Sequence, residues 1–184
     1  ENIARDLALA KDAGFTDIVV DVRPTTGDVL FKTNLVDQVK FMYAWIGSNY
    51  TKVERTATWD YLQAFVDEAR KQGLRIHAAI NTFVGGNQID GGTGLLYRDQ
   101  SKAEWATQMN MQVGITSVMN TSESTKFFNP AHPEVQTFLC DLLKDLAGYD
   151  LDGIFLDRGR FLNLQADFSE ESRKQFEEYM GGIR

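Results

Sequence analysis

Cysteine and histidine are scarce in this sequence: 184 residues include one cysteine, Cys140, and two histidines. A single cysteine excludes a disulfide within the chain and a zinc site built from several cysteines. Cys140 lies beside the apolar positions of a predicted helix over residues 133–147. We therefore expect a structural thiol rather than a nucleophile, and we predict no metal site.

Basic residues and long apolar runs are also few. Lys and Arg number 19 against 26 Asp and Glu, which gives a formal net charge of -7. Nucleic acids and anionic membranes bind basic surfaces, so neither is expected as a partner. No apolar run approaches the roughly 20 residues that span a bilayer, so no membrane span is predicted. No signal peptide is visible, although the chain opens on Glu1 rather than Met, so physical grounds leave the compartment open.

The composition is that of a globular chain, with 43% hydrophobic and 24% charged residues. A chain of this length buries a sizeable core, and one domain over residues 1–184 is the natural count. Helical spacing of apolar residues precedes each of three apolar or β-branched strands. The predicted strands cover residues 17–23, 74–80 and 153–157. Such alternation is typical of a parallel sheet covered by helices.

The number of elements falls short of a complete barrel, which typically needs about 250 residues. The chain begins on a helix and ends on another that opens at Ser169. We therefore predict an α/β fold, a partial (β/α)8 TIM-type barrel that is truncated at both ends. A doubly wound sheet is the alternative, but the glycine-rich residues 85–94 match neither a dinucleotide fingerprint nor a P-loop. The long connections 24–58, 82–100 and 109–130 are expected to be functional, and residues 114–119 and 125–128 to form a hairpin.

Polar side chains gather where the predicted strands end, which is where barrels of this kind place their sites. The candidates are Asp21, Arg23, Asn81, Asp157, Arg158 and Arg160. Side chains two apart share a face of a strand, so Asp21 lies on the same face as Arg23, and Phe155 on the same face as Asp157. Asp21 and Arg23 are equally consistent with a buried ion pair and with a substrate clamp.

For other polar and aromatic residues, a purely structural role is at least as well supported as a role in function. His77 is expected to be a packed, hydrogen-bonded strand residue, and His132 to cap the helix that follows it. Asn87 and Asp90 supply too few oxygens for calcium, which takes 6–8. Several aromatic side chains in the long connections could stack on sugar rings, but ordinary packing is favoured. These are Tyr43, Trp45, Tyr50, Tyr97 and Trp105.

Two adjoining segments carry a resemblance to a known family. Phe128-Asn-Pro-Ala-His-Pro-Glu-Val135, followed by Tyr149-Asp-Leu-Asp-Gly-Ile-Phe-Leu-Asp157, resembles the bacterial glycosyl-hydrolase-like barrel family, a distant relative of the alpha-amylases. Residues 10–24 and 69–78 are similar to the helix–strand units that precede these segments in the family. The similarity extends over most of residues 3–160.

The resemblance implies a carbohydrate substrate, no organic cofactor, and a secreted, periplasmic or cell-surface protein. It places Asp157 where alpha-amylase relatives keep their nucleophilic aspartate. A retaining glycosidase needs such an ionised carboxylate and a second, protonated carboxyl. In the family that acid follows the next strand, which lies outside this chain. Asp21, Arg23, Asn81, Arg158 and Arg160 are then expected to bind substrate.

The sequence also departs from the family. Many members continue with a second acid and a tyrosine, whereas here Asp157 is followed by Arg-Gly-Arg-Phe161. Arg158 and Arg160 could bind an anionic sugar or form ion pairs with Asp157. Two alternatives therefore stay open: a non-catalytic glycan-binding barrel, and a phosphate- or carboxylate-handling enzyme that uses Arg23, Arg158 and Arg160.

Overall fold

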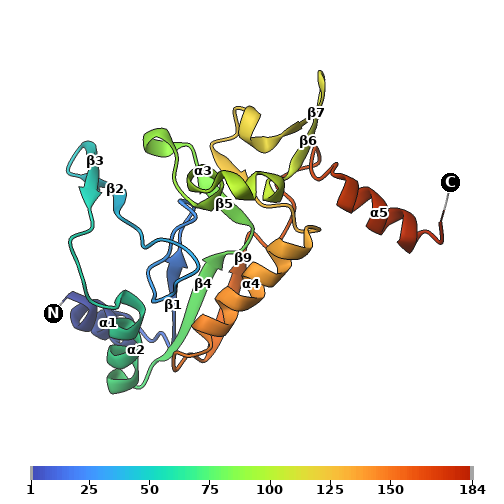
Figure 1. The fold of residues 1–184 in the computed structure, drawn as a ribbon. Helices are drawn as coiled ribbons and strands as arrows, with labels where there is room; N and C mark the ends of the chain where they lie inside the picture. Colours follow the sequence, from blue (N-terminus) through green and yellow to red (C-terminus); the bar gives the residue numbers. More distant parts are fainter. Residues whose placement is uncertain (1, 183–184) are drawn as a thin grey trace.

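The computed structural model describes residues 2–182 and contains a parallel sheet of three strands in the order β1-β4-β9 (Figure 1). Each of these strands follows a helix, which confirms the predicted helix–strand repeat. The strands are β1 (Asp17–Arg23), β4 (Arg75–Asn81) and β9 (Gly153–Asp157). The helices are α1 (Asn2–Asp12), α2 (Tyr61–Gln72), α3 (Leu95–Arg98), α4 (Pro133–Leu146) and α5 (Glu170–Tyr179).

The helices begin and end at residues suited to those positions. Asp60 caps α2 by accepting a hydrogen bond from the Gln63 backbone N–H at 3.1 Å. Gly73 ends α2 with φ of 68°, a left-handed conformation that favours glycine. The expected capping role of His132 is confirmed, because its Nδ1 accepts from the Glu134 N–H at 3.2 Å at the start of α4.

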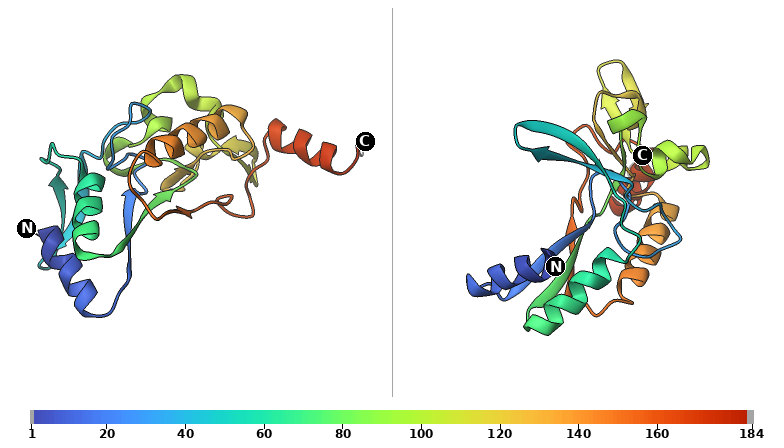
Figure 2. Two further views of the ribbon diagram at one scale, coloured as in Figure 1. Left: turned by 90° about the horizontal axis from the view of Figure 1, so that it is seen from below. Right: turned by 90° about the vertical axis from the view of Figure 1, so that its left-hand side faces the viewer.

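Helices α1, α2 and α4 bury their apolar stripes against one face of the sheet (Figure 2). That face consists of alternate strand residues, as period-two geometry requires. The strand residues in this core are Val20, Val22, Ile76, Ala78 and Ile80. The helix residues that meet them are Leu7, Leu62, Val66, Ala69, Leu142 and Leu146. A second cluster, around Trp105, Phe128 and Phe138, joins the long connections to α4.

The opposite face of the sheet has no comparable covering among residues 2–182. Val19 on β1 and Phe155 on β9 belong to this face and are largely exposed. β1 and β9 are the outer strands of the sheet. We call this surface the open face, defined by Val19, Asp21, Ala79, Phe155 and Asp157.

Within residues 2–182, the long connections contain three antiparallel pairs of strands. β2 (Phe41–Ile46) pairs with β3 (Asn49–Glu54), and β6 (Gln108–Met111) pairs with β7 (Gly114–Ser117). β5 (Val84–Asn87) pairs with β8 (Thr125–Phe127). The predicted hairpin between residues 114–119 and 125–128 is therefore wrong. β7 pairs with β6, which directly precedes it, and β8 pairs with β5, about 40 residues upstream.

Helix α5 projects away from the rest of the molecule (Figures 1 and 2). Ser169 caps it, as expected, by accepting from the Ser172 N–H at 3.2 Å. Its aromatic residues, Phe176 and Tyr179, are exposed.

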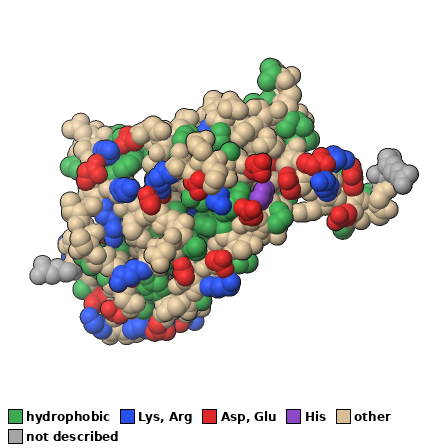
Figure 3. Space-filling view, in the orientation of Figure 1, with side chains coloured by type: hydrophobic (Ala, Val, Ile, Leu, Met, Phe, Trp, Pro, Cys, Tyr) green, Lys and Arg blue, Asp and Glu red, His purple; other side chains and the backbone are tan. Residues whose placement is uncertain are grey.

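Charged side chains of both signs are interspersed over the face shown in Figure 3, and neither sign forms a continuous patch there. None of the helices within residues 2–182 is both long enough and apolar enough to span a membrane.

Candidate functional site

The carboxyl ends of β1, β4 and β9 bring three of the predicted residues together. All three strands run parallel, and Asn81 on β4 pairs in register with Asp157 on β9. Asp21 lies near the end of β1, in register with Ala79. A pocket of about 270 Å³ on the open face is lined by Val19, Asp21, Ala79, Asn81, Phe155 and Asp157. The strand-end site, as we call this set, is thus formed by residues from all three strands.

Asp157 points to this pocket rather than toward the helices. Its side chain is exposed, and its Oδ1 accepts a hydrogen bond from the Arg158 backbone N–H at 2.7 Å. Its backbone carbonyl accepts from the Thr82 N–H at 2.7 Å, which extends the β4–β9 ladder by one bond. Arg158 takes a left-handed φ of 48°, so the chain turns sharply just after the carboxylate. Asp157 therefore lies at the rim, and its second carboxylate oxygen accepts no hydrogen bond from residues 2–182.

Asp21 lies in a different electrostatic environment. Its Oδ1 accepts from the Arg23 backbone N–H at 3.1 Å. Desolvation by the neighbouring atoms raises the pKa of the Asp21 carboxyl, and repulsion from the Asp157 carboxylate raises it further. Donation from the Arg23 N–H and from Asn81, together with the charge of Arg23, opposes that rise without cancelling it. Asp21 and Asp157 are therefore two neighbouring carboxylates that interact electrostatically.

Arg23 is fully buried, and its guanidinium is used within the protein. It donates to the backbone carbonyls of Asn81, Thr82 and Val84, where β4 turns into β5. Burial lowers the pKa of Arg23 to about 10, and the Asp21 carboxylate opposes that shift. Neither a side-chain ion pair with Asp21 nor an exposed clamp is formed by Arg23 within residues 2–182. Arg23 instead holds the turn beside the strand-end site, and we correct its expected ligand contact to this indirect role.

Asn81 is also buried, and its Nδ2 donates to the Arg23 carbonyl at 2.9 Å. It therefore ties β4 to β1 at the edge of the sheet, while part of its side chain lines the pocket. Arg160 is exposed and donates to the Phe161 and Leu162 carbonyls at 2.9 and 2.6 Å. Across residues 2–182, neither Arg158 nor Arg160 forms an ion pair with Asp157, so these arginines stay near the rim without neutralising the carboxylate.

Comparison with known proteins identifies the family to which this chain belongs. The family model described as glycosyl hydrolase-like 10 matches residues 3–181. The chain belongs to this family. An S-layer-related protein of Niallia circulans is 30% identical over 187 residues, which cover 98% of this chain and 11% of that relative. The chain thus spans about a tenth of the length of that curated relative.

Solved structures show the same fold at low identity. A hypothetical protein from Ruminiclostridium thermocellum ATCC 27405 matches with a TM-score of 0.59 and 14% identity, covering 99% of this chain and 86% of that chain. Alpha-L-fucosidase isoenzyme 2 from Paenibacillus thiaminolyticus matches with a TM-score of 0.61 and 18% identity, covering 98% of this chain and 22% of that chain.

The remaining candidates of this family member lie away from the strand ends. His77 Nε2 lies 2.9 Å from Asp17 Oδ1 at the amino end of the sheet, where Arg75 also binds Asp17. Asp90 accepts from the Tyr43 hydroxyl at 2.8 Å and pairs with Lys52 at 2.7 Å. Within residues 2–182 there is no group of three or more His, Cys, Asp or Glu side chains that could hold a metal.

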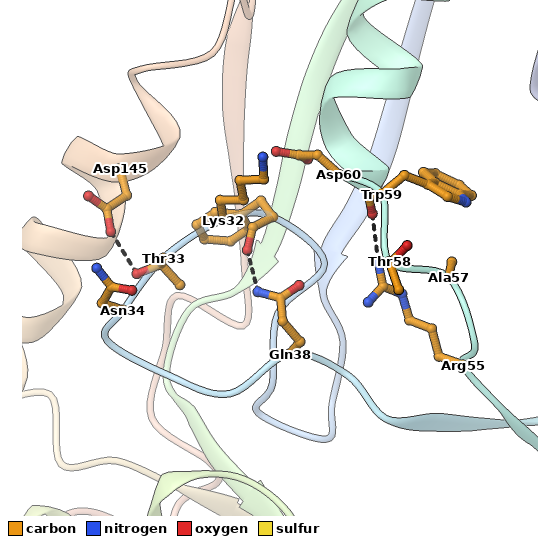
Figure 4. Close-up of a pocket in the computed structure, with 11 residues that line it drawn as sticks. Lys32, Thr33, Asn34, Gln38, Arg55, Ala57, Thr58, Trp59, Asp60 and Asp145 are labelled. Atoms are coloured by element: carbon orange, nitrogen blue, oxygen red, sulfur yellow. Dashed lines mark hydrogen bonds between the residues drawn. The ribbon is translucent and has the colours of Figure 1, made fainter.

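A larger cavity lies elsewhere on this glycosyl hydrolase-like domain, between the start of α2, the last turns of α4 and the loop 31–38 (Figure 4). Its volume is about 670 Å³. The carboxylates there already have partners, because Asp145 accepts from the Thr33 hydroxyl at 2.6 Å and Asp60 accepts from the Tyr149 hydroxyl at 2.7 Å. The smaller strand-end site instead holds the two neighbouring carboxylates, Asp21 and Asp157.

Sequence reasoning found only part of the apolar half of the strand-end site, because it placed Phe155 on the face of Asp157 but did not name Val19 or Ala79. Val19, Ala79 and Phe155 line the pocket beside the polar residues. Counting back by two from Asp21, Asn81 and Asp157 finds all three of them, because alternate residues share a face. The electrostatic interaction between Asp21 and Asp157 could not be found that way, since it depends on which strands are neighbours and in what register.

Proposed function

We propose that this domain acts on the glycosidic bond of a poly- or oligosaccharide, with Asp157 as the reactive carboxylate. The observation that carries the proposal is the position of Asp157: exposed at the carboxyl end of β9, in register with Asn81, and open to a pocket on the face away from the helices. An oxocarbenium-like centre is stabilised by such an ionised carboxylate. Family membership supports the choice of a sugar over other electrophiles.

Asp21 and Asn81 would hold the sugar in this proposal. The Asp21 carboxyl accepts hydrogen bonds and the Asn81 amide both donates and accepts them, as sugar hydroxyls require. Arg158 and Arg160 lie next to Asp157 in the chain and would favour a sugar that carries a carboxylate or sulfate. Val19 and Phe155 would pack against the apolar face of the ring.

The fold itself is part of the proposal. The uncovered apolar side chains of the open face, and the position of β1 and β9 as outer strands, support a partial barrel of the alpha-amylase-like type over residues 1–184. Further strands would pair with these edges, and the general acid would come from the strand that follows. The S-layer-related relative supports a secreted, cell-surface location.

A catalytically silent glycan-binding barrel is the second candidate. Asp157 is followed by Arg-Gly-Arg rather than by a second acid, and this departure from the family favours it. Both candidates use the same pocket and the same ligand class, so they differ only in turnover.

The experiment is a hydrolysis screen of the full-length protein, which would supply the strand with the general acid, against a panel of polysaccharides, with Asp157→Asn and the surface control Asp141→Asn. We expect Asp157→Asn to lower turnover by at least about a thousandfold while binding is kept, because the amide cannot stabilise developing positive charge. Unchanged turnover in Asp157→Asn would remove this residue from the mechanism. Binding by the wild type without turnover would select the silent barrel.

A further inference from the structure

Residues 158–169 connect β9 to α5 as a loop, which we call the β9–α5 loop. Its second half lies against β6, which Figure 1 shows beside the start of α5. The Phe168 N–H donates to the Gln108 carbonyl at 2.9 Å, and Ala166 forms a bridge with Met109. The loop that leaves the strand-end site is therefore attached to β6 at its far end.

Asp167 supplies the side-chain part of this attachment. Its Oδ1 accepts from the Thr107 hydroxyl at 2.7 Å and from the Gln108 N–H at 2.6 Å. Its Oδ2 accepts from the Ser169 N–H at 3.0 Å and from the Ser172 hydroxyl at 2.7 Å, and the Ser169 hydroxyl also donates to it. One carboxylate thus binds donors at the start of β6 and in the first turn of α5.

The donors around Asp167 favour its charged form. Desolvation raises the pKa of the Asp167 carboxyl, but the hydrogen bonds from Ser169, Gln108 and the other donors outweigh it and bring the pKa below its ordinary value. Hydrogen bonds to an ionised acceptor are among the strong ones in proteins. An asparagine here would place a side-chain amide donor where N–H and O–H donors converge, so it could not keep all of these bonds.

A role confined to capping α5 does not account for these contacts. Ser169 is the N-cap residue of α5, and its hydroxyl accepts from the Ser172 N–H at 3.2 Å. The bonds from Thr107 and Gln108 to Asp167 lie on the β6 side and contribute nothing to the first turn of the helix. These two bonds therefore hold the β9–α5 loop.

The first half of the loop forms the rim of the strand-end site. The Arg158 N–H donates to the Asp157 carboxylate at 2.7 Å. The Arg160 guanidinium donates to the carbonyls of the next two residues at 2.9 and 2.6 Å. Leu162 and Ala166 then pack against the second core cluster. Contacts thus follow the loop from the site to its attachment on β6.

We propose that Asp167 is a positioning residue for the strand-end site: by holding the far end of the β9–α5 loop on β6, it fixes where Arg158 and Arg160 lie at the rim. The inference rests on the proposed function, in which these arginines bind the sugar. It adds a residue outside the pocket that determines substrate binding. Asp157 itself is held by the pairing of β9 with β4, so the loop governs binding more than the reactive carboxylate.

Amide hydrogen exchange in the full-length protein tests the attachment without any ligand. Thr107→Val and Ser172→Ala are a matched pair, because each removes one hydroxyl 2.7 Å from the Asp167 carboxylate, on the β6 side and on the α5 side respectively. We expect Asp167→Asn to speed exchange over residues 158–166 by at least about tenfold, with β4 unchanged. Thr107→Val should act in the same direction by a smaller factor, and Ser172→Ala should leave these residues unchanged.

Kinetics of the full-length protein test the effect on the site. The probes are polygalacturonate and chondroitin sulfate as anionic polymers, and laminarin and starch as neutral ones. We expect Asp167→Asn to raise KM by about tenfold for a polymer that the wild type cleaves, and to change kcat by less than about threefold. The rise should be larger for an anionic polymer than for a neutral one, because the displaced side chains are arginines. For a polymer that binds without turnover, the dissociation constant replaces KM.

The outcomes separate the two proposals. Equal exchange over residues 158–166 in the wild type and Asp167→Asn overturns the positioning role and leaves the proposed function standing. Faster exchange with unchanged KM shows that Asp167 is structural only, and equal effects of Thr107→Val and Ser172→Ala assign its role to capping α5; either result also overturns the positioning role. A wild type that neither binds nor cleaves any of the four polymers overturns both proposals.

Discussion

At the residue scale, the strand-end site depends on two carboxylates that the fold places in unequal environments. Asp157 is exposed at the rim with one oxygen that has no donor among residues 2–182, whereas Asp21 is partly desolvated and lies near the charge of Asp157. Pairs of titratable groups with different environments are a common basis for acid–base and nucleophilic chemistry. The unequal environments of these two carboxyl groups therefore support the proposed role of the strand-end site.

The coupling between the two carboxylates can be measured directly. We expect the Asp21 carboxyl to titrate above its ordinary pKa of about 3.9, and to titrate lower in Asp157→Asn, because the repelling charge is gone. A raised acid pKa in the folded state contributes stability that is present below the unfolded pKa and is lost as the pH rises through the folded pKa. Asp157→Asn should therefore gain stability relative to the wild type at neutral pH, and this gain should vanish under acidic conditions.

Carboxyl-carbon NMR titration of the wild type and Asp157→Asn tests this expectation, with Asp141→Asn as a control that should leave Asp21 unchanged. An Asp21 midpoint that is identical in the wild type and Asp157→Asn would show that the two groups do not interact.

The polar residues of the site were predictable from sequence to different degrees. Asp21, Asn81 and Asp157 follow from the rule that parallel strands end at one edge of a sheet. The buried role of Arg23 does not, because it depends on how the chain turns at residues 82–84 after β4. An arginine at a strand end looks the same in sequence whether it faces solvent or backbone carbonyls.

At the scale of elements, the helix–strand units were predictable and the hairpins were not. The helices have clear apolar periodicity and end signals such as Gly73 and Pro133. The β2–β3 hairpin lies in a stretch that we expected to be irregular, although Tyr43 and Trp45 alternate and Gly47 follows in the turn with φ of 63°. The pairing of β8 with β5 is nonlocal, so no short-range pattern reveals it.

The anchoring of the β2–β3 hairpin leads to a test at this scale. We expect Asp90→Gly to speed amide hydrogen exchange across residues 41–54 by roughly severalfold while exchange in β4 stays unchanged, because the substitution removes the contacts to Tyr43 and Lys52. Glycine suits the left-handed φ of 51° at this position, so backbone strain does not confound the result.

Glu54→Gln is the control for the hairpin, since it removes the other ion pair of Lys52 and leaves Asp90 in place. Equal exchange in Asp90→Gly and the wild type would show that the hairpin does not depend on this anchor.

At the scale of the whole molecule, one face of the sheet is covered by helices and the other is open. Phe128 lies in the second core cluster with 0% of its surface exposed, whereas Phe155 on the open face is 58% exposed. The difference allows a matched comparison of two phenylalanines in one chain. We expect Phe128→Ala to lower the free energy of unfolding by roughly 3–5 kcal/mol and Phe155→Ala to lower it by less than about 1 kcal/mol.

Chemical denaturation of both variants measures these costs. A large cost for Phe155→Ala would mean that the open face is covered in solution, for example by a second copy of the chain. The partial-barrel proposal requires further strands that cover the open face. In a longer form of the protein that contains them, Phe155→Ala should lower the free energy of unfolding by more than it does here.

The most direct test of the strand-end site is to locate a bound sugar by amide chemical-shift mapping with short oligosaccharides of the polysaccharides in the hydrolysis panel. If the sugar binds at the carboxyl ends of the strands, the largest shifts will fall on Asp21, Thr82 and Arg158. Shifts that instead centre on Thr33, Asn34 and Thr58, which line the larger cavity beside α2 and α4, would contradict it.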